Sequence, residues 1–139
     1  MALAEELITY TNSNKICCRT GFDSENSWIY ANWTGFIREE DIRNWSVQFL
    51  DLLRQTKTQK LLNNNLEVRS TWRKANTWIV EELIPVAISE GLKALAHIIP
   101  TDPFAADSAS DLERKINYPG FTMMLFNNSE QAKNWLQSF

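Results

Sequence analysis

The sequence is poor in the residues on which many cofactor and metal sites depend. It contains four glycines, two cysteines and one histidine. No Gly-rich stretch follows an apolar run, so the sequence favours neither dinucleotide nor P-loop nucleotide binding. One histidine and two adjacent cysteines, Cys17 and Cys18, supply too few separate ligands for tetrahedral zinc. We therefore expect no metal ion and no cofactor.

The sequence also lacks a concentration of positive charge. Its 14 Lys and Arg residues are scattered among 17 Asp and Glu residues, giving a net charge of −3. Nucleic acid and anionic membranes bind basic patches, so neither is an expected partner. No apolar run approaches membrane-spanning length, and residues 1–10 lack the pattern of a secretory signal. We therefore expect no membrane insertion.

The two cysteines indicate a reducing compartment. Neighbouring residues of an extended chain face opposite sides, so Cys17 and Cys18 are poorly placed to bridge each other. We expect free thiols, which are typical of intracellular proteins. The sequence therefore predicts a cytoplasmic location.

What is present is typical of a single globular domain over residues 1–139. Hydrophobic residues make up 44% of the chain, charged residues 22%, and there are six tryptophans. The stretch "GFDSENS" is rich in turn formers and predicts a hairpin with arms at 15–20 and 27–34. Residues 7–11 allow a further edge strand. The second arm has large apolar residues in both alternating sets, so we expect it to be covered on both faces.

The rest of the chain alternates between helical and strand patterns. Apolar residues three or four apart predict helices, and short apolar runs bounded by turn formers predict strands. Pro85 predicts a kink or break near Glu81, and Ser108 followed by Asp111 predicts a helix start. The predicted elements are helices at 38–55, 72–90, 108–116 and after Asn128, and strands at 60–64, 92–99 and 120–126.

This order of elements predicts an α/β fold with a single mixed β-sheet. Strands that alternate with helices become parallel neighbours joined by right-handed crossovers. We expect about five strands and about four helices, with an N-terminal hairpin followed by parallel β-α-β units.

Five stretches that together run through most of the chain carry a family resemblance. They are "WIYANWTGFI", "LLNNN", "TWIVEELIPVAISEGLKALAHIIPTDPF", "FTMMLFNN" and "SEQAKNWLQSF". In this order they resemble the small bacterial α/β domains related to STAS domains and anti-sigma factor antagonists, which are grouped with the CRAL-TRIO lipid-transfer fold. The resemblance implies a STAS-like domain, in a group with many uncharacterised members.

The sequence departs from the family pattern at the residues that carry its regulatory switch. In antagonist-type STAS domains the corresponding strand ends in an acidic residue, and a hydroxyl residue at the next helix start is phosphorylated. Here asparagines stand at the strand end, and Ser70 and Thr71 are the hydroxyls at the helix start, preceded by Arg69. The resemblance makes Ser70 and Thr71 candidate phosphoacceptors, although the usual switch is not expected in its usual form. A phosphate there would be favoured by the helix N-terminus and by Arg69.

Polar residues at the predicted strand ends form the candidate ligand site. In open parallel sheets, ligands bind outside the carboxyl ends of the strands, where three loops meet in the predicted fold. The alternative is that these residues only end strands and form turns, which their types favour regardless of function. The candidate ligand-binding residues are Asn63, Asn64, Asn65, Thr101, Asp102, Phe104 and Asn127.

The sequence offers no convergent catalytic group, so we do not expect an enzyme. His97 lies in the middle of a predicted buried strand, where a satisfied core histidine is the expectation. Glu81 and Glu82 are adjacent on a helix and therefore point to different sides. Neither pattern predicts acid-base catalysis.

Three functional hypotheses remain open from the sequence. The first is a non-enzymatic STAS-like regulatory or interaction module that binds a protein partner or forms a homodimer. The second is a carrier of a small molecule or lipid, similar to the CRAL-TRIO relatives, with an apolar ligand in a cleft between sheet and helices. The third is an enzyme of unknown type with its site in the strand-end loops. Aromatic residues of the hairpin and the second helix need a cover, which could be the helices, a second subunit or an apolar ligand.

Overall fold

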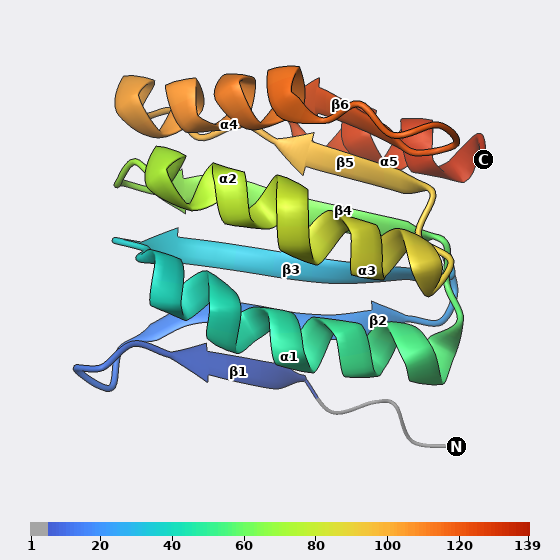
Figure 1. Ribbon diagram of the computed structural model, residues 1–139, viewed down its shortest axis with the longest axis horizontal. Helices are drawn as coiled ribbons and strands as arrows, with labels where there is room; N and C mark the ends of the chain where they lie inside the picture. The colour runs from blue at the N-terminus through green and yellow to red at the C-terminus, as the bar shows by residue number, and fades with distance from the viewer. Residues whose placement is uncertain (1–5) are drawn as a thin grey trace.

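The chain forms one mixed β-sheet whose strands are ordered in space as they are in the sequence. The computed structural model describes residues 6–139 (Figure 1). The first three strands are antiparallel neighbours, and each later strand runs parallel to the one before it. The strands are β1 (Leu7–Tyr10), β2 (Ile16–Asp23), β3 (Trp28–Gly35), β4 (Lys60–Val68), β5 (Ala94–Ile98) and β6 (Thr122–Phe126). The α/β class and the mixed sheet are therefore confirmed, with six strands in the described part of the chain instead of about five.

The helices form two unequal layers. Strand order advances in the same direction at every parallel connection, so right-handed crossovers place all the connecting helices on one face. Figure 1 shows α1 to α4 on that face and α5 behind the sheet. The helices are α1 (Glu39–Thr56), α2 (Asn76–Trp78), α3 (Ile84–Ser89), α4 (Pro103–Lys115) and α5 (Ser129–Gln137).

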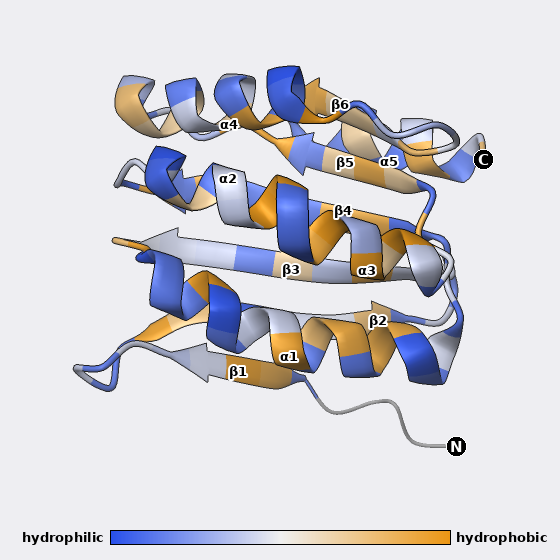
Figure 2. Cartoon of the chain, viewed as in Figure 1, coloured by the Kyte–Doolittle hydropathy of each residue, from blue (hydrophilic) through white to orange (hydrophobic). Residues whose placement is uncertain are grey.

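The sheet separates two hydrophobic cores. The larger one lies under α1 to α4 and takes Ile29, Ala31 and Trp33 from β3. The smaller one lies under α5 and takes Trp28 from the same strand. Figure 2 shows α1 alternating between hydrophobic and hydrophilic stretches, as expected of a helix with one buried side. The prediction that this hairpin arm is covered on both faces is confirmed.

The second predicted helix is interrupted where Pro85 requires it. A 3-10 turn (Arg73–Ala75) leads into α2, and a π-helical turn (Ile79–Leu83) separates α2 from α3. Proline lacks a backbone N–H and its ring clashes with the carbonyl four residues earlier, here that of Glu81. The wider π-helical turn accommodates that loss, and such turns often occur at functional sites. The predicted break near Glu81 is present in this form.

Two predicted boundaries are wrong. The helix expected at 108–116 begins at Pro103, because Asp102 Oδ1 accepts the N–H groups of Phe104 and Ala105 at 2.9 and 3.1 Å. The strand expected at 60–64 continues to Val68. Its asparagines form cross-strand and local hydrogen bonds within the sheet and therefore do not terminate the strand.

Candidate functional site

The three consecutive asparagines of β4 face two different sides of the sheet. Asn63 and Asn65 face the larger core, because residues two apart on a strand share a face. Asn64 faces the other side, and its Oδ1 accepts the Leu66 N–H at 3.0 Å. The register against β3 shifts by one residue just after this point, which marks a β-bulge. The bulge then brings Val68, and not Glu67, into the larger core.

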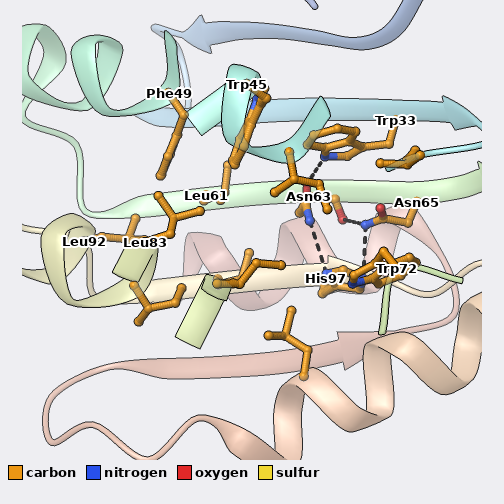
Figure 3. Close-up of a pocket in the computed structure, with 16 residues that line it drawn as sticks. Trp33, Trp45, Phe49, Leu61, Asn63, Asn65, Trp72, Leu83, Leu92 and His97 are labelled. Atoms are coloured by element: carbon orange, nitrogen blue, oxygen red, sulfur yellow. Dashed lines mark hydrogen bonds between the residues drawn. The ribbon is translucent and has the colours of Figure 1, made fainter. Parts of the chain in front are cut away.

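Asn63 and Asn65 hold the single histidine between them (Figure 3). Trp33 Nε1–H donates to Asn63 Oδ1 at 2.7 Å. The Nδ2 atom of Asn63 lies 3.2 Å from His97 Nδ1, and the side-chain amide of Asn65 lies 3.1 Å from His97 Nε2. Side chains from three adjacent strands thus form one polar row inside the larger core.

Burial keeps the His97 ring uncharged. The residue is 1% exposed, and the loss of hydration lowers its pKa from 6.5 to about 3. The indole of Trp72 lies against it, with ring centroids 5.7 Å apart. At neutral pH the ring is a neutral imidazole that carries one N–H donor and one acceptor nitrogen.

The polar row borders a cavity of about 60 Å³ between the sheet and the helices. Aromatic side chains form part of its wall, with Trp45 edge-on to Trp33 at 5.2 Å and stacked on Phe49 at 4.7 Å between ring centroids. Among residues 6–139, no Asp, Glu, Lys or Arg side chain lines it, so an uncharged ligand fits its chemistry. The lining residues are Trp33, Ile37, Ile42, Trp45, Phe49, Leu61, Asn63, Asn65, Trp72, Ile79, Leu83, Ile84, Leu92, Leu95, His97 and Leu112.

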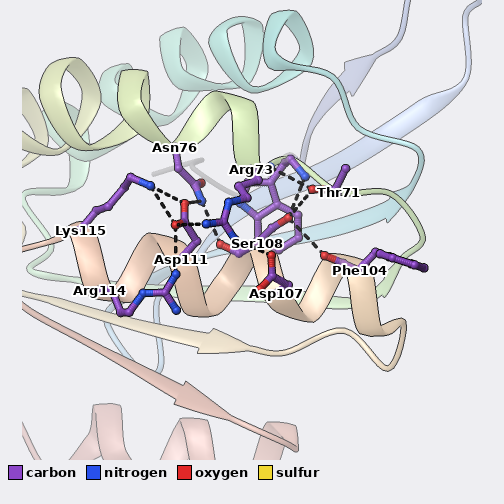
Figure 4. A network of polar contacts seen from close by, with 10 residues as sticks. Thr71, Arg73, Asn76, Phe104, Asp107, Ser108, Asp111, Arg114 and Lys115 are labelled. Atoms are coloured by element: carbon purple, nitrogen blue, oxygen red, sulfur yellow. Dashed lines mark hydrogen bonds and ion pairs between the residues drawn. The ribbon is translucent and has the colours of Figure 1, made fainter.

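A polar network joins the helical segments that cover one side of this cavity (Figure 4). The buried carboxylate of Asp111, on α4, accepts from Asn76 Nδ2 at 3.0 Å and from Lys115 Nζ at 2.8 Å. Arg73 adds an ion pair to Asp111 at 3.1 Å. These contacts, led by the hydrogen bonds from Lys115 and Asn76, lower the pKa of Asp111 to about 2. Asp111 therefore ties α2 to α4. The sequence predicted that it would serve the helix start, and this prediction is wrong.

Ser108 belongs to the same network. Its Oγ accepts the Trp72 N–H at 3.0 Å and lies 2.8 Å from Thr71 Oγ1. The predicted role of Ser108 as a helix cap is therefore wrong, since it links the start of the interrupted helix to the middle of α4. Trp72 is positioned over His97 by this link.

The structure separates the predicted ligand-binding residues into three groups. Asn63 and Asn65 line the cavity, whereas Asn64 lies on the opposite face of the sheet. The remaining four lie at the surface: Thr101, Asp102, Phe104 and Asn127. The described strands advance in one direction, so they contain no reversal of strand order of the kind that opens a ligand crevice at strand ends.

The hydroxyl groups of both candidate phosphoacceptors accept backbone hydrogen bonds. Ser70 Oγ accepts the Ile37 N–H at 2.8 Å, and Thr71 Oγ1 accepts the Arg73 N–H at 3.2 Å. The Arg73 guanidinium contacts Asp107 at 2.6 Å. Phosphorylation of either hydroxyl remains a prediction.

Sequence reasoning missed His97, Trp33 and Trp72 as members of one site. Two asparagines at alternate positions of a strand are a signal that two amides share one face, and a histidine on the next strand is a natural partner. The pairing of Asn63 with His97 depends on the β4–β5 register, which a single sequence does not fix.

Comparisons with models of known protein families, with curated proteins and with solved structures find no match to this chain. Within residues 6–139, no helix is both long enough and apolar enough to cross a membrane. In the same part of the chain, no group of three or more His, Cys, Asp or Glu side chains is placed to hold a metal ion.

Proposed function

We propose that this chain is a non-enzymatic binding domain that takes a small, uncharged, largely apolar molecule into the cavity between its sheet and helices. The observation that carries the proposal is the combination of an apolar, aromatic wall with a row of hydrogen-bonded amides at one end. Binding sites for small molecules have this composition, with a few polar groups that orient the ligand in an apolar pocket.

The size of the cavity limits the ligand. At about 60 Å³ it is smaller than the cavity of about 150 Å³ that holds benzene in an engineered protein. A lipid chain would require the helices to move apart, so the small-molecule form of the carrier hypothesis is the one we propose. Both nitrogens of His97 face amides, which argues against general-base catalysis by this residue.

The binding proposal is tested by NMR with a matched pair of variants. Small uncharged compounds should shift the indole N–H signal of Trp33, which lines the cavity, but not that of Trp28, which lies in the smaller core. Leu61→Phe should fill the cavity and abolish these shifts. Leu62→Phe is the control, since Leu62 is similarly buried but faces the smaller core. Equal binding by both variants would place the ligand elsewhere.

A second proposal retains the STAS-like interaction module with a protein partner or a second copy of the chain. It rests on two aromatic side chains, Phe36 just after β3 and Phe104 in the first turn of α4, which are 74% and 76% exposed. Sedimentation of the wild type should reveal a dimer that Phe36→Ser and Phe104→Ser disrupt. Val47→Ser is the control, since Val47 is 70% exposed on α1. A wild type that remains monomeric at high concentration argues against the dimer.

We also propose a cytoplasmic location. Cys17 and Cys18 are buried free thiols, and burial raises the pKa of both, that of Cys17 to about 11. Unpaired thiols fit a reducing compartment. Fractionation of cells that express the protein tests this location.

A further inference from the structure

The hydrogen bonds of the polar row have one direction. The Trp33 indole nitrogen is a donor only, so the atom of Asn63 at 2.7 Å from it is the carbonyl oxygen. The Nδ2 atom of Asn63 therefore faces His97 Nδ1 as a donor. His97 Nδ1 must accept, and the proton of the neutral ring lies on Nε2.

This proton determines the orientation of the next amide. His97 Nε2–H needs an acceptor, and the side chain at 3.1 Å is the amide of Asn65. Amide oxygen and nitrogen are distinguished by their hydrogen bonds, not by their shape. A nitrogen at this position would set two donors against each other, so the Asn65 oxygen faces His97. The Asn65 nitrogen then occupies the far side of the amide, away from the ring, and the longer contact of 3.5 Å between this amide and the backbone oxygen of Asn63 is given up.

The resulting chain of donors ends in the cavity. Trp33 donates to Asn63, Asn63 to His97 and His97 to Asn65. Within residues 6–139 no hydrogen-bond partner lies on the far side of the Asn65 amide, so its N–H groups form the free end. Asn65 is 4% exposed and lines the cavity. A buried N–H without an acceptor is unfavourable, so an occupant that supplies an acceptor removes that deficit.

We propose that the cavity selects uncharged ligands that carry a hydrogen-bond acceptor, such as a ketone, ester or amide carbonyl, and that Asn65 Nδ2 donates to that acceptor. This proposal rests on the proposed binding function and names the class of ligand. A group that can only donate would meet another donor at this end of the cavity. A hydrocarbon would leave the Asn65 N–H groups unpaired.

A pair of planar probes of the same shape tests the selection. The two probes are acetone, which carries a carbonyl oxygen, and 2-methylpropene, which carries a CH₂ group in place of that oxygen. Titration of the Trp33 indole signal measures the affinity of each probe. We expect acetone to bind about tenfold more tightly than 2-methylpropene, because one additional buried hydrogen bond contributes about 1.4 kcal/mol. Equal affinities would overturn the acceptor preference and leave the binding function intact. If neither probe binds, both proposals fail.

The direction of the row is tested without any ligand and without any variant. The chain has one histidine, so ¹⁵N labelling of histidine gives one pair of ring signals. We expect the two-bond ¹H–¹⁵N pattern of the Nε2–H tautomer. The Nδ1–H tautomer would reverse both amides and overturn the proposal. A variant adds a third readout: Asn65→Asp keeps an acceptor toward His97 but lacks the N–H groups, so it should lose the preference for acetone.

Discussion

Trp33 and Asn63 are joined by a hydrogen bond of 2.7 Å between the indole N–H and the amide oxygen, and this bond orients every polar group that follows it. It connects β3 to β4 on the face that carries α1 to α4. A tryptophan that would otherwise serve only as apolar bulk thus determines which atom of the neighbouring amide reaches the histidine.

Removing the amide of Asn63 should destabilise the fold more than removing that of Asn64. In Asn63→Ala, two buried groups, Trp33 Nε1–H and His97 Nδ1, lose their partners, at about 1–3 kcal/mol each. In Asn64→Ala, the one side-chain hydrogen bond that Asn64 makes within residues 6–139, to the Leu66 N–H, is lost, at about 1 kcal/mol. Urea unfolding of both variants measures the difference. Equal losses of unfolding free energy would mean that the polar row stabilises the fold no more than the single hydrogen bond of Asn64 does.

The stability of the protein should fall as the pH is lowered from 6.5 toward 3. The pKa of His97 is lowered from 6.5 to about 3 by burial, so in this window the unfolded chain binds a proton that the folded protein excludes. Linkage gives a loss of about 3 kcal/mol between pH 6.5 and about pH 4. Below pH 3 both states are protonated and His97 causes no further loss.

A variant without the titrating ring isolates this effect. His97→Gln retains an amide that hydrogen-bonds but does not titrate, whereas the carboxylates of the chain are unchanged. Urea unfolding over the same pH range should give a shallower slope for His97→Gln than for the wild type. Parallel slopes would show that His97 is not responsible for the pH dependence.

Substitutions of Asp111 and Asp107 should differ strongly in their effect on stability, although both residues pair with Arg73. The Asp111 carboxylate is buried and has three further partners, so Asp111→Asn should lower the free energy of unfolding by about 1–3 kcal/mol. The Asp107 side chain is 55% exposed, and Asp107→Asn should change stability by no more than about 0.5 kcal/mol.

Low pH should remove the difference between these two variants. The pKa of Asp111 is lowered to about 2, so its contribution is complete above its ordinary value of 3.8 and is lost as the pH falls through 2. Thermal unfolding at about pH 7 and about pH 2 measures this change. A difference that persists at the lower pH would contradict the assigned ion pairs.

Gly21 and Tyr30 should be energetically coupled. A Cβ atom on Gly21 would lie 2.5 Å from Tyr30 Oη, so Gly21→Ala displaces the ring, whose hydroxyl donates to Glu6 at 2.7 Å. In a Tyr30→Ala background the added methyl group finds space, and the same change should have little effect. A double-mutant cycle should therefore give a coupling of about 1 kcal/mol. A coupling energy near zero would show that the Tyr30 ring can move aside without any loss of stability.

Much of the fold follows from patterns visible in the sequence. The amphipathic spacing of 38–55 predicts α1 almost to the residue, and the turn formers at 21–27 predict the β2–β3 hairpin. Asp102 illustrates where such reasoning fails. Asp102 followed by Pro103 and Ser108 followed by Asp111 are both sound helix starts, and only the packing of Ser108 against Trp72 distinguishes them.

The candidate site was predicted less well, for a physical reason. The sequence places Asn63 and Asn65 near a strand end, where polar residues usually serve turns. Their meeting with His97 depends on the register of two parallel strands separated by a helix, and that register is set by the whole sheet. Asn63 and Asn65 therefore belong to both the predicted and the observed candidate site, but the predicted site lies at the strand ends and the observed one lies between the sheet and the helices.

The strand order also has a consequence for how the protein acquires its structure. Each strand pairs with the next strand along the chain, so no pairing has to wait for a distant segment. The entropy of closing each connection is that of a single crossover, which favours rapid folding for a parallel sheet. We expect the sheet to grow by successive addition from the hairpin as the chain emerges from the ribosome, with β4 providing the template on which β5 brings His97 to its amides.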